Sequence, residues 1–314
     1  MKRVILACFG TAVALTVAYS VMAGYFLGNY LVEFGLAREG KEPPQAYALI
    51  MPEDFRTFDE PKYVNERWLY KSADGLTLTA TEFYPDTASH KWAIVVHGYG
   101  CTQQNSWYIA DNYLSWGYNV VTPNLRSSGD SEGKYLTLGY KESWDVLTTA
   151  REIVRRDDKA RIVLHGVSMG AVSVMLAAAS DELIPEVVAC IEDSGYTSAY
   201  HLLALKLEDS FSLPAFPAMN FLDWRCQRRA DFSLHQADPL GVIHRVKIPI
   251  LFIQGAKDIL VPPYMVDLLY EECQSPGKDI WIAEESLHGV ACQMERELYN
   301  DKVRGFLRPI IDEQ

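Results

Sequence analysis

The sequence predicts an α/β fold in which a mostly parallel β-sheet is covered by helices on both faces. Apolar runs of strand length alternate with helical stretches, and each apolar run ends in a loop of small or polar residues. Strands that are apolar along their whole length are typical of parallel sheets buried on both sides. The chain length of 314 residues suits one large domain with an insertion and a tail.

The N-terminus predicts a membrane anchor. No charged residue lies between Arg3 and Glu33, so residues 1–32 are able to cross the roughly 30 Å of hydrocarbon in a bilayer. A cleaved signal peptide has a shorter apolar region, and residues 21–24 form a poor cleavage site. We expect an uncleaved signal anchor, with secretion after cleavage as the alternative. Because Lys2 and Arg3 precede the helix, the N-terminus is expected in the cytoplasm and the rest of this single-pass protein outside it.

The folded domain is expected to begin near residue 66. Residues 33–65 contain several prolines and no clear periodicity, which predicts a linker before a domain of residues 66–314. Two β-rich runs on either side of Asp74 and Gly75 are typical of a β-hairpin. Four more strand-like runs lie at 92–100, 118–133, 161–170 and 187–196. Helical stretches separate them at 104–116, 139–156 and 171–180.

A helical cap is predicted where the alternation stops. Residues 197–241 are rich in apolar side chains but show no strand-and-turn pattern, so they are expected to form an insertion between sheet elements. Its apolar side chains are expected either to line an acyl pocket or to pack the cap onto the sheet: Leu202, Leu203, Leu205, Phe211, Phe216, Met219, Phe221 and Trp224. Strand-like runs then return at 248–263 and 278–289, with helices at 264–273 and 293–308.

Charge and cysteine content narrow the class of protein. The formal net charge of −12 would repel phosphate backbones, so a nucleic-acid partner is not expected. The six cysteines are scattered, and no Cys or His spacing suits zinc. Only Cys8 lies in the N-terminal segment, which leaves an odd number elsewhere. We expect most of the cysteines to be small buried apolar residues.

Ser168 is the predicted nucleophile. It stands between Gly166 and Gly170, where the strand-like run ending in LHGV gives way to an Ala-rich helical run. A nucleophile on a sharp strand-to-helix turn has a strained backbone, and close packing at the bend excludes side chains two residues before and after it. The alternative is an ordinary serine at a helix N-cap.

A serine hydroxyl needs a base to accept its proton and an acid to orient that base. His288 follows the last strand-like run, and Asp258 follows the run before it. Because the carboxyl ends of parallel strands meet at one sheet edge, both residues are expected close to Ser168. Asp193, at the end of the preceding run, is the rival acid.

These residues carry a resemblance to a known family. The motifs HGYG at 97–100 and GVSMG at 166–170, Asp258 within GAKDILVP, and His288 followed by glycine make residues 66–308 similar to the α/β-hydrolase superfamily. The similarity is strongest to bacterial serine hydrolases of the prolyl oligopeptidase and acylaminoacyl-peptidase-like esterase branch. It implies an eight-stranded, mostly parallel sheet with helices on both faces and a helical cap.

The resemblance also implies an oxyanion hole. In this family one backbone N–H comes from the residue after the nucleophile, here Met169, and a second comes from the loop after the third strand, here Tyr99. The loop NLRSSGDSEG resembles the family's Asp-x-Arg-Gly-x-Gly-x-Ser loop, with Asn124 replacing Asp and Ser127 replacing the first Gly. Arg126 within it is expected to form a structural ion pair rather than to bind substrate.

The function that these expectations imply is hydrolysis of carboxylic ester or thioester bonds by Ser168, His288 and Asp258 through an acyl-enzyme. No metal or organic cofactor is required. The substrate is expected to be a small acyl ester or a short peptide. A serine peptidase or an acyltransferase with the same three residues is the alternative, and a non-catalytic binding protein on the same fold is a third.

Overall fold

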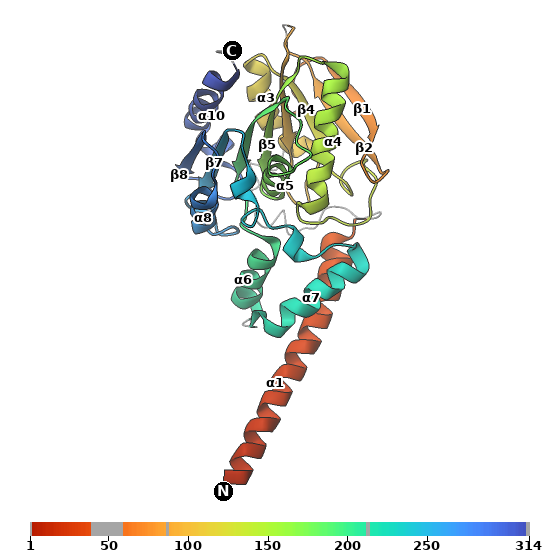
Figure 1. The fold of residues 1–314 in the computed structure, drawn as a ribbon, viewed down its shortest axis with the longest axis vertical. Helices are drawn as coiled ribbons and strands as arrows, with labels where there is room; N and C mark the ends of the chain where they lie inside the picture. Colours follow the sequence, from red (N-terminus) through yellow and green to blue (C-terminus); the bar gives the residue numbers. More distant parts are fainter. Residues whose placement is uncertain (1, 39–58, 86–87, 212–213, 312–314) are drawn as a thin grey trace.

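The computed structural model describes residues 2–38, 59–85, 88–211 and 214–311. Within these ranges eight strands form one sheet, in the spatial order β1-β2-β4-β3-β5-β6-β7-β8 (Figure 1). The strands are β1 (Asn65–Lys71), β2 (Thr77–Phe83), β3 (Lys91–Val96), β4 (Asn119–Asn124), β5 (Arg161–Val167), β6 (Val187–Asp193), β7 (Ile250–Gly255) and β8 (Lys278–Ala283). The predicted eight-stranded α/β-hydrolase fold is confirmed.

The sheet is parallel except at one edge. Strand β2 pairs antiparallel with β1 and with β4, while all pairs from β4 through β8 are parallel. The predicted hairpin joins β1 to β2, and Gly75 in its turn has φ of 91°, a left-handed conformation that favours glycine. The parallel strands bring the loops after β5, β6, β7 and β8 to one edge of the sheet.

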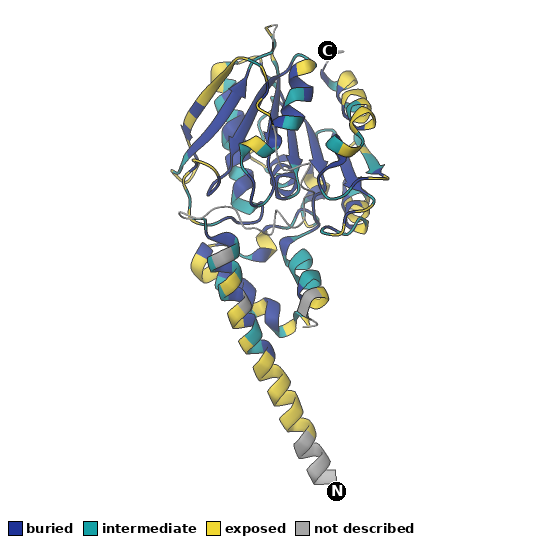
Figure 2. Cartoon of the chain, turned by 180° about the vertical axis from the view of Figure 1, so that it is seen from behind, coloured by how far each residue is buried: buried dark blue, intermediate teal, exposed yellow. Residues whose placement is uncertain are grey.

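Helices cover both faces of the sheet. Alternate side chains of one strand enter different apolar clusters: Ile94 belongs to one cluster, and Val95 belongs to the other. One face is covered by α3 (Trp107–Ser115) and α10 (Arg296–Ile311), and the other by α4 (Tyr140–Arg156), α5 (Met169–Ala178) and α8 (Tyr264–Glu272). In Figure 2 the inner strands are accordingly buried, whereas the edge strand β1 and the outer helices carry exposed residues.

Two predicted helices differ in detail from the observed ones. The stretch predicted at 104–116 begins with the 3₁₀ turn η3 (Gln103–Ser106) before α3. The stretch predicted at 293–308 is divided into α9 (Ala291–Met294) and α10. Glu295 lies between the two helices, and its carboxylate accepts hydrogen bonds from the backbone of Glu285 and the hydroxyl of Ser286, which ties this break to the loop after β8.

The cap contains two helices, α6 (Ala199–Phe211) and α7 (Ala215–Ala230), and 3₁₀ turns η4 (Leu234–Gln236) and η5 (Ile243–Arg245) lead back to the sheet. Helix α7 packs along the N-terminal helix α1 (Lys2–Tyr30). Gly24 and Gly28, one turn apart on α1, allow this close approach. A Cβ atom on Gly24 would lie 2.9 Å from the Ala218 carbonyl oxygen, and one on Gly28 would lie 3.0 Å from Cγ of Arg225.

The N-terminal helical segment extends beyond the predicted boundary at residue 32. After α1 the chain continues as a π-helical segment, η1 (Leu31–Leu36), in which Val32 and Leu36 are fully buried. Within the described residues, one stretch, Phe9–Glu33, is long and apolar enough to cross a membrane. The predicted linker at 33–65 falls mostly outside the described residues, but its first residues belong to this helical segment.

Candidate active site

Ser168 lies on the sharp turn between β5 and α5. Its φ of 58° and ψ of −120° are a strained combination for a residue with a side chain. The flanking glycines are required by contact: a Cβ on Gly166 would lie 2.2 Å from the carbonyl oxygen of Gly170, and one on Gly170 would lie 2.3 Å from that of Val96. Close packing at the bend therefore excludes a side chain at both glycine positions.

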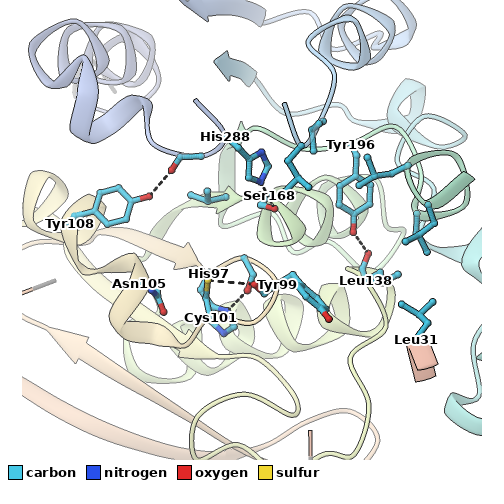
Figure 3. Close-up of a pocket in the computed structure, with 18 residues that line it drawn as sticks. Leu31, His97, Tyr99, Cys101, Asn105, Tyr108, Leu138, Ser168, Tyr196 and His288 are labelled. Carbon is cyan, nitrogen blue, oxygen red and sulfur yellow. Dashed lines mark hydrogen bonds between the residues drawn. The ribbon is translucent and has the colours of Figure 1, made fainter. Parts of the chain in front are cut away.

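The structure brings the three predicted residues into one hydrogen-bonded chain. Oγ of Ser168 is 2.9 Å from Nε2 of His288, and Nδ1 of His288 is 2.7 Å from Oδ2 of Asp258. The loops after β5, β7 and β8 supply the three side chains, as their order along the sequence predicts. Figure 3 shows His288 and Ser168 pointing toward one another within the pocket.

The carboxylate of Asp258 is buried and accepts hydrogen bonds from several donors. Besides His288, it accepts from the side-chain amide of Gln254 at 2.8 Å and from the backbone N–H groups of Leu260 at 2.8 Å and Val261 at 2.9 Å. Such a ring of donors fixes the orientation of the carboxylate. A carboxylate held in this way can in turn hold a histidine in one orientation.

Asp193, the rival acid, has another role in this structure. Its carboxylate accepts hydrogen bonds from the hydroxyls of Ser194 at 2.8 Å and Tyr299 at 3.2 Å. Ser194 in turn accepts the backbone N–H of Gly289 at 3.0 Å, so Asp193 acts on the loop next to His288. Burial raises the pKa of Asp193 to about 6, against the hydrogen bonds from Ser194 and Tyr299, which lower it.

Two other histidines at strand ends are buried structural residues. His97 lies next to Gly98, with Nδ1 2.9 Å from the Gly98 carbonyl oxygen and Nε2 3.2 Å from the backbone N–H of Leu125. Burial lowers the pKa of His97 to about 4, so its neutral ring donates at Nδ1 and accepts at Nε2. His165 lies between the hydroxyls of Tyr113 and Tyr299, and burial lowers its pKa to about 3.

The two backbone groups predicted for an oxyanion hole lie beside Ser168. Met169 is the first residue of α5, where a backbone N–H has no acceptor within the helix. Tyr99 follows Gly98 in the loop after β3, and a Cβ on Gly98 would lie only 3.2 Å from Cβ of Ser168. The loop therefore passes close to the nucleophile candidate, and His97 fixes its start.

The side chain of Tyr99 joins this loop to the N-terminal segment. Its hydroxyl donates to the carbonyl oxygen of Gly35 at 2.8 Å, and the guanidinium of Arg38 lies 5.1 Å from the centre of its ring. The sequence indicated a role for the Tyr99 backbone N–H alone, and it placed Gly35 in a linker. The contact shows that the start of that segment is part of the site.

The loop after β4 departs from the family pattern at two positions and is held by its own hydrogen bonds and ion pairs. Ser127 has φ of 61°, so it adopts the left-handed conformation that the family's glycine would allow. Asn124 accepts the backbone N–H of Gln103 at 2.9 Å and donates to the hydroxyl of Thr79 at 2.8 Å. Arg126 makes the expected structural ion pairs and is itself buried. Its guanidinium contacts Asp145 at 2.7 Å and Asp74 at 2.8 Å.

An apolar pocket of about 260 Å³ opens over Ser168 and His288 (Figure 3). Helix α6 contributes Leu202 and Leu203, as one of the two interpretations of the cap predicts. The N-terminal segment contributes Leu31, which the sequence did not indicate. Helix α6 also contributes Ala199, and α3 contributes Tyr108. The remaining lining residues come from loops at the sheet edge, the end of β5 and the turn η3: His97, Gly98, Tyr99, Cys101, Asn105, Leu138, Val167, Tyr196, Leu260, Val261 and Gly289.

The other apolar cap residues named from the sequence do not line the pocket. Met219 is fully buried in the core, Phe221 lies against α1, and Phe216 and Trp224 are exposed on α7. Leu205 packs against the core cluster, and the side chain of Phe211 lies outside the described residues. Among the residues that the structure describes, no group of His, Cys, Asp and Glu is arranged to hold a metal ion.

The fold and this geometry agree with the match to a family. Residues 93–288, more than half of the chain, match the α/β hydrolase family. The chain therefore belongs to the α/β hydrolase family.

Individual relatives are distant. The chain is 28% identical over 215 residues to the uncharacterized protein YqkD of Bacillus subtilis, covering 68% of this chain and 70% of that protein. It is 24% identical over 195 residues to the uncharacterized membrane protein YNL320W of Saccharomyces cerevisiae, covering 62% of each. The solved structure of the Pyrococcus furiosus esterase Pf2001 is similar with a TM-score of 0.66 at 22% identity, covering 83% of this chain and 94% of that one. At 22% identity, this structural similarity shows a shared fold.

Proposed function

We propose that this protein is a serine hydrolase that cleaves carboxylic ester or thioester bonds, with Ser168 as nucleophile, His288 as general base and Asp258 as the orienting acid. The observation that carries the proposal is the continuous chain of hydrogen bonds from Ser168 through His288 to Asp258, at 2.9 and 2.7 Å. Nucleophile and base at such distances, with the base held by a third group, define this chemistry.

The reaction proceeds in two halves. As Oγ of Ser168 attacks the carbonyl carbon, Nε2 of His288 accepts its proton, and the N–H groups of Met169 and Tyr99 donate to the oxyanion. Collapse of the intermediate expels the alcohol or thiol, which takes the proton from His288. Water then attacks the acyl-enzyme with His288 again as base, and the carboxylic acid leaves as Ser168 regains its proton.

The apolar pocket favours an ester or thioester with a hydrocarbon acyl group. Five leucines line it beside Ser168 and His288, and apolar walls bind apolar substrate groups. They are Leu31, Leu138, Leu202, Leu203 and Leu260. The likeness of the fold to an esterase of Pyrococcus furiosus agrees with this choice. A serine peptidase or acyltransferase with the same triad is the second candidate, because a scaffold alone does not choose the acyl acceptor.

The protein is proposed to be anchored in a membrane by its N-terminal helix, with the catalytic domain outside the cytoplasm. The apolar stretch Phe9–Glu33 and the relation to a yeast membrane protein support membrane association. Removal of the helix as a signal peptide is disfavoured. Cleavage at residues 21–24 would detach the domain from part of the helix surface that packs against α7.

Hydrolysis of p-nitrophenyl esters by the full-length protein tests this proposal. Wild type should hydrolyse them, and Ser168→Ala should lose at least about a thousandfold in kcat/KM, as expected when a catalytic nucleophile is removed. Ser180→Ala, a change at a serine beyond the end of α5, is the matched control and should keep wild-type activity. Hydrolysis by Ser168→Ala at the wild-type rate would contradict the assignment.

A further inference from the structure

The N-terminal helix that enters the membrane also forms part of the active-site pocket. Leu31, one residue after the end of α1, lines the pocket. Four residues later, the carbonyl of Gly35 accepts the hydroxyl of Tyr99. Because these contacts belong to one continuous helical segment, the distance along the helix from the pocket to the bilayer is short.

The position along α1 at which it first packs against the domain sets the depth of the domain relative to the membrane. From Phe9 to Tyr19 every residue is exposed, and burial against the domain begins at Ser20. Residues 4–19, which follow the charged Lys2 and Arg3, form about 24 Å of helix at 1.5 Å per residue, most of the roughly 30 Å of bilayer hydrocarbon. The part of α1 beyond Ser20 then lies at the membrane surface, and α7 lies there with it.

The surface of α7 has the composition of a membrane interface. Phe216 is 75% exposed and Trp224 is 43% exposed. Arginines follow Trp224 on the same helix, with the guanidinium groups of Arg225 and Arg228 each 5.7 Å from its ring centre. Exposed aromatic rings beside basic side chains are typical of residues at the level of lipid headgroups.

Helix α1 also carries exposed aromatic side chains at this depth relative to the membrane. Exposed aromatic side chains of α1 lie near its contact with α7: Tyr19, Tyr25, Phe26 and Tyr30. Arg225 contacts both Asn29 and the ring of Tyr25, and Arg229 pairs with Glu33, so the two helices present one joined surface. Figure 1 shows α6 and α7 lying between the sheet and the free end of α1, which places the pocket's Leu202 and Leu203 on the membrane side of the domain.

We propose that the substrate of this site is a long-chain acyl ester held in the bilayer, which enters the pocket from the membrane side between the start of η1 and α6. This inference rests on the proposed ester hydrolase activity and names its substrate class. The wall that faces the membrane is apolar, with Leu31 from the anchor and Leu202 and Leu203 from the cap. An acyl chain passing from lipid into this pocket stays in apolar surroundings throughout, so it avoids the cost of about 0.8 kcal/mol for exposing each CH₂ to water.

The test uses full-length protein in phosphatidylcholine vesicles, with p-nitrophenyl palmitate carried in the vesicles and p-nitrophenyl acetate in the water. The double variant Phe216→Ser/Trp224→Ser should lose about tenfold in palmitate hydrolysis, equivalent to about 1.4 kcal/mol, and keep the acetate rate. The matched control, Val64→Ser/Leu69→Ser, also removes two exposed apolar side chains, but from the β1 edge, and should change neither rate. Leu31→Trp, which narrows the entrance, should lower the ratio of palmitate to acetate hydrolysis by about tenfold.

The outcomes separate this inference from the proposed function. Acetate hydrolysis that depends on Ser168, together with wild-type palmitate hydrolysis by the double variant on α7, would overturn the membrane route and leave the ester hydrolase standing. An unchanged palmitate-to-acetate ratio in Leu31→Trp would overturn it equally. If wild type hydrolysed neither ester, the proposed function itself would fail, and this inference would fail with it.

Discussion

Asp258 and His288 are joined by a hydrogen bond of 2.7 Å between Oδ2 and Nδ1, and the other partners of this carboxylate are donors as well. The backbone N–H groups of Leu260 and Val261 and the amide of Gln254 complete the set. A side chain at this position therefore has to accept at both oxygens, which only a carboxylate does.

Replacing Asp258 by Asn tests this requirement. The amide NH₂ of Asn would face one or more donors, so the variant should favour the wrong tautomer of His288. We expect kcat to fall by about 10⁴-fold and the thermal unfolding midpoint to fall as well, because a buried donor loses its acceptor. Asp267→Asn, at an exposed aspartate on α8, is the control. Activity of Asp258→Asn within tenfold of wild type would remove Asp258 from the triad.

Ser194 is predicted to position the loop that carries His288. Its hydroxyl accepts the N–H of Gly289 at 3.0 Å and donates to Asp193 at 2.8 Å. Ser194→Ala leaves that buried N–H without this acceptor, so we expect a loss of about 1–3 kcal/mol in the free energy of unfolding. We also expect kcat to fall by more than KM changes. Ser173→Ala is the control, because this buried hydroxyl donates to a helix carbonyl. Equal effects of the two variants on kcat would refute the positioning role.

Asp193 predicts a pH dependence of stability. Its pKa is raised by burial from 3.8 to about 6, so between these values the folded protein holds a proton that the unfolded chain has lost. The contribution of Asp193 to the free energy of unfolding is therefore fully present below pH 3.8. It is lost as the pH rises through about 6, and the free energy of unfolding then falls by on the order of 3 kcal/mol.

Asp193→Asn should remove this dependence while keeping an acceptor for Ser194. The measurement is the urea midpoint of wild type and variant in detergent, between about pH 4.5 and pH 7.5. The variant should gain stability relative to wild type as the pH rises. A difference between the two proteins that stays constant with pH would contradict a raised pKa of Asp193.

The contact between α1 and α7 predicts different effects for two glycines on the same helix. A Cβ on Gly28 would lie 3.0 Å from Arg225, whereas one on Gly10 would meet nothing within 4 Å. Gly28→Leu should therefore separate α7 from α1 and destabilise the domain by about 1–3 kcal/mol. Hydrolysis of p-nitrophenyl esters should also fall, because Leu31 moves. Gly10→Leu should preserve both stability and activity. Thermal unfolding and p-nitrophenyl ester hydrolysis in detergent measure the two effects.

The sequence predicted the sheet and the residues at its edge because two simple regularities govern them. Apolar strands alternating with helices define a parallel sheet, and parallel strands bring their carboxyl ends together. Ser168, Asp258 and His288 each follow such a strand, so their proximity could be inferred without knowing any side-chain contact. The two glycines around Ser168 indicated that it is the nucleophile. A Cβ atom at either position would lie only 2.2 or 2.3 Å from a backbone carbonyl oxygen, so neither position has room for a side chain.

Other parts of the site depend on contacts that leave no local pattern. Leu31 and Gly35 follow an apolar run that a membrane anchor fully explains, so nothing in that run shows that its end packs against a domain. Ser194 joins Asp193 to Gly289 across two loops distant in sequence. In the cap, Leu202 lines the pocket while Trp224 is exposed. Composition alone does not show which side of a cap helix faces the pocket, because the helix that packs against its other side is not known from the sequence.

The central claim, that Ser168 is a nucleophile activated by His288, is tested most directly by covalent labelling. A fluorophosphonate probe should react with wild-type protein, with the adduct located on Ser168 by peptide mass spectrometry. Ser168→Ala should remain unlabelled, and His288→Ala should be labelled far more slowly because the hydroxyl has lost its base. Equal labelling of wild type and Ser168→Ala would contradict the account.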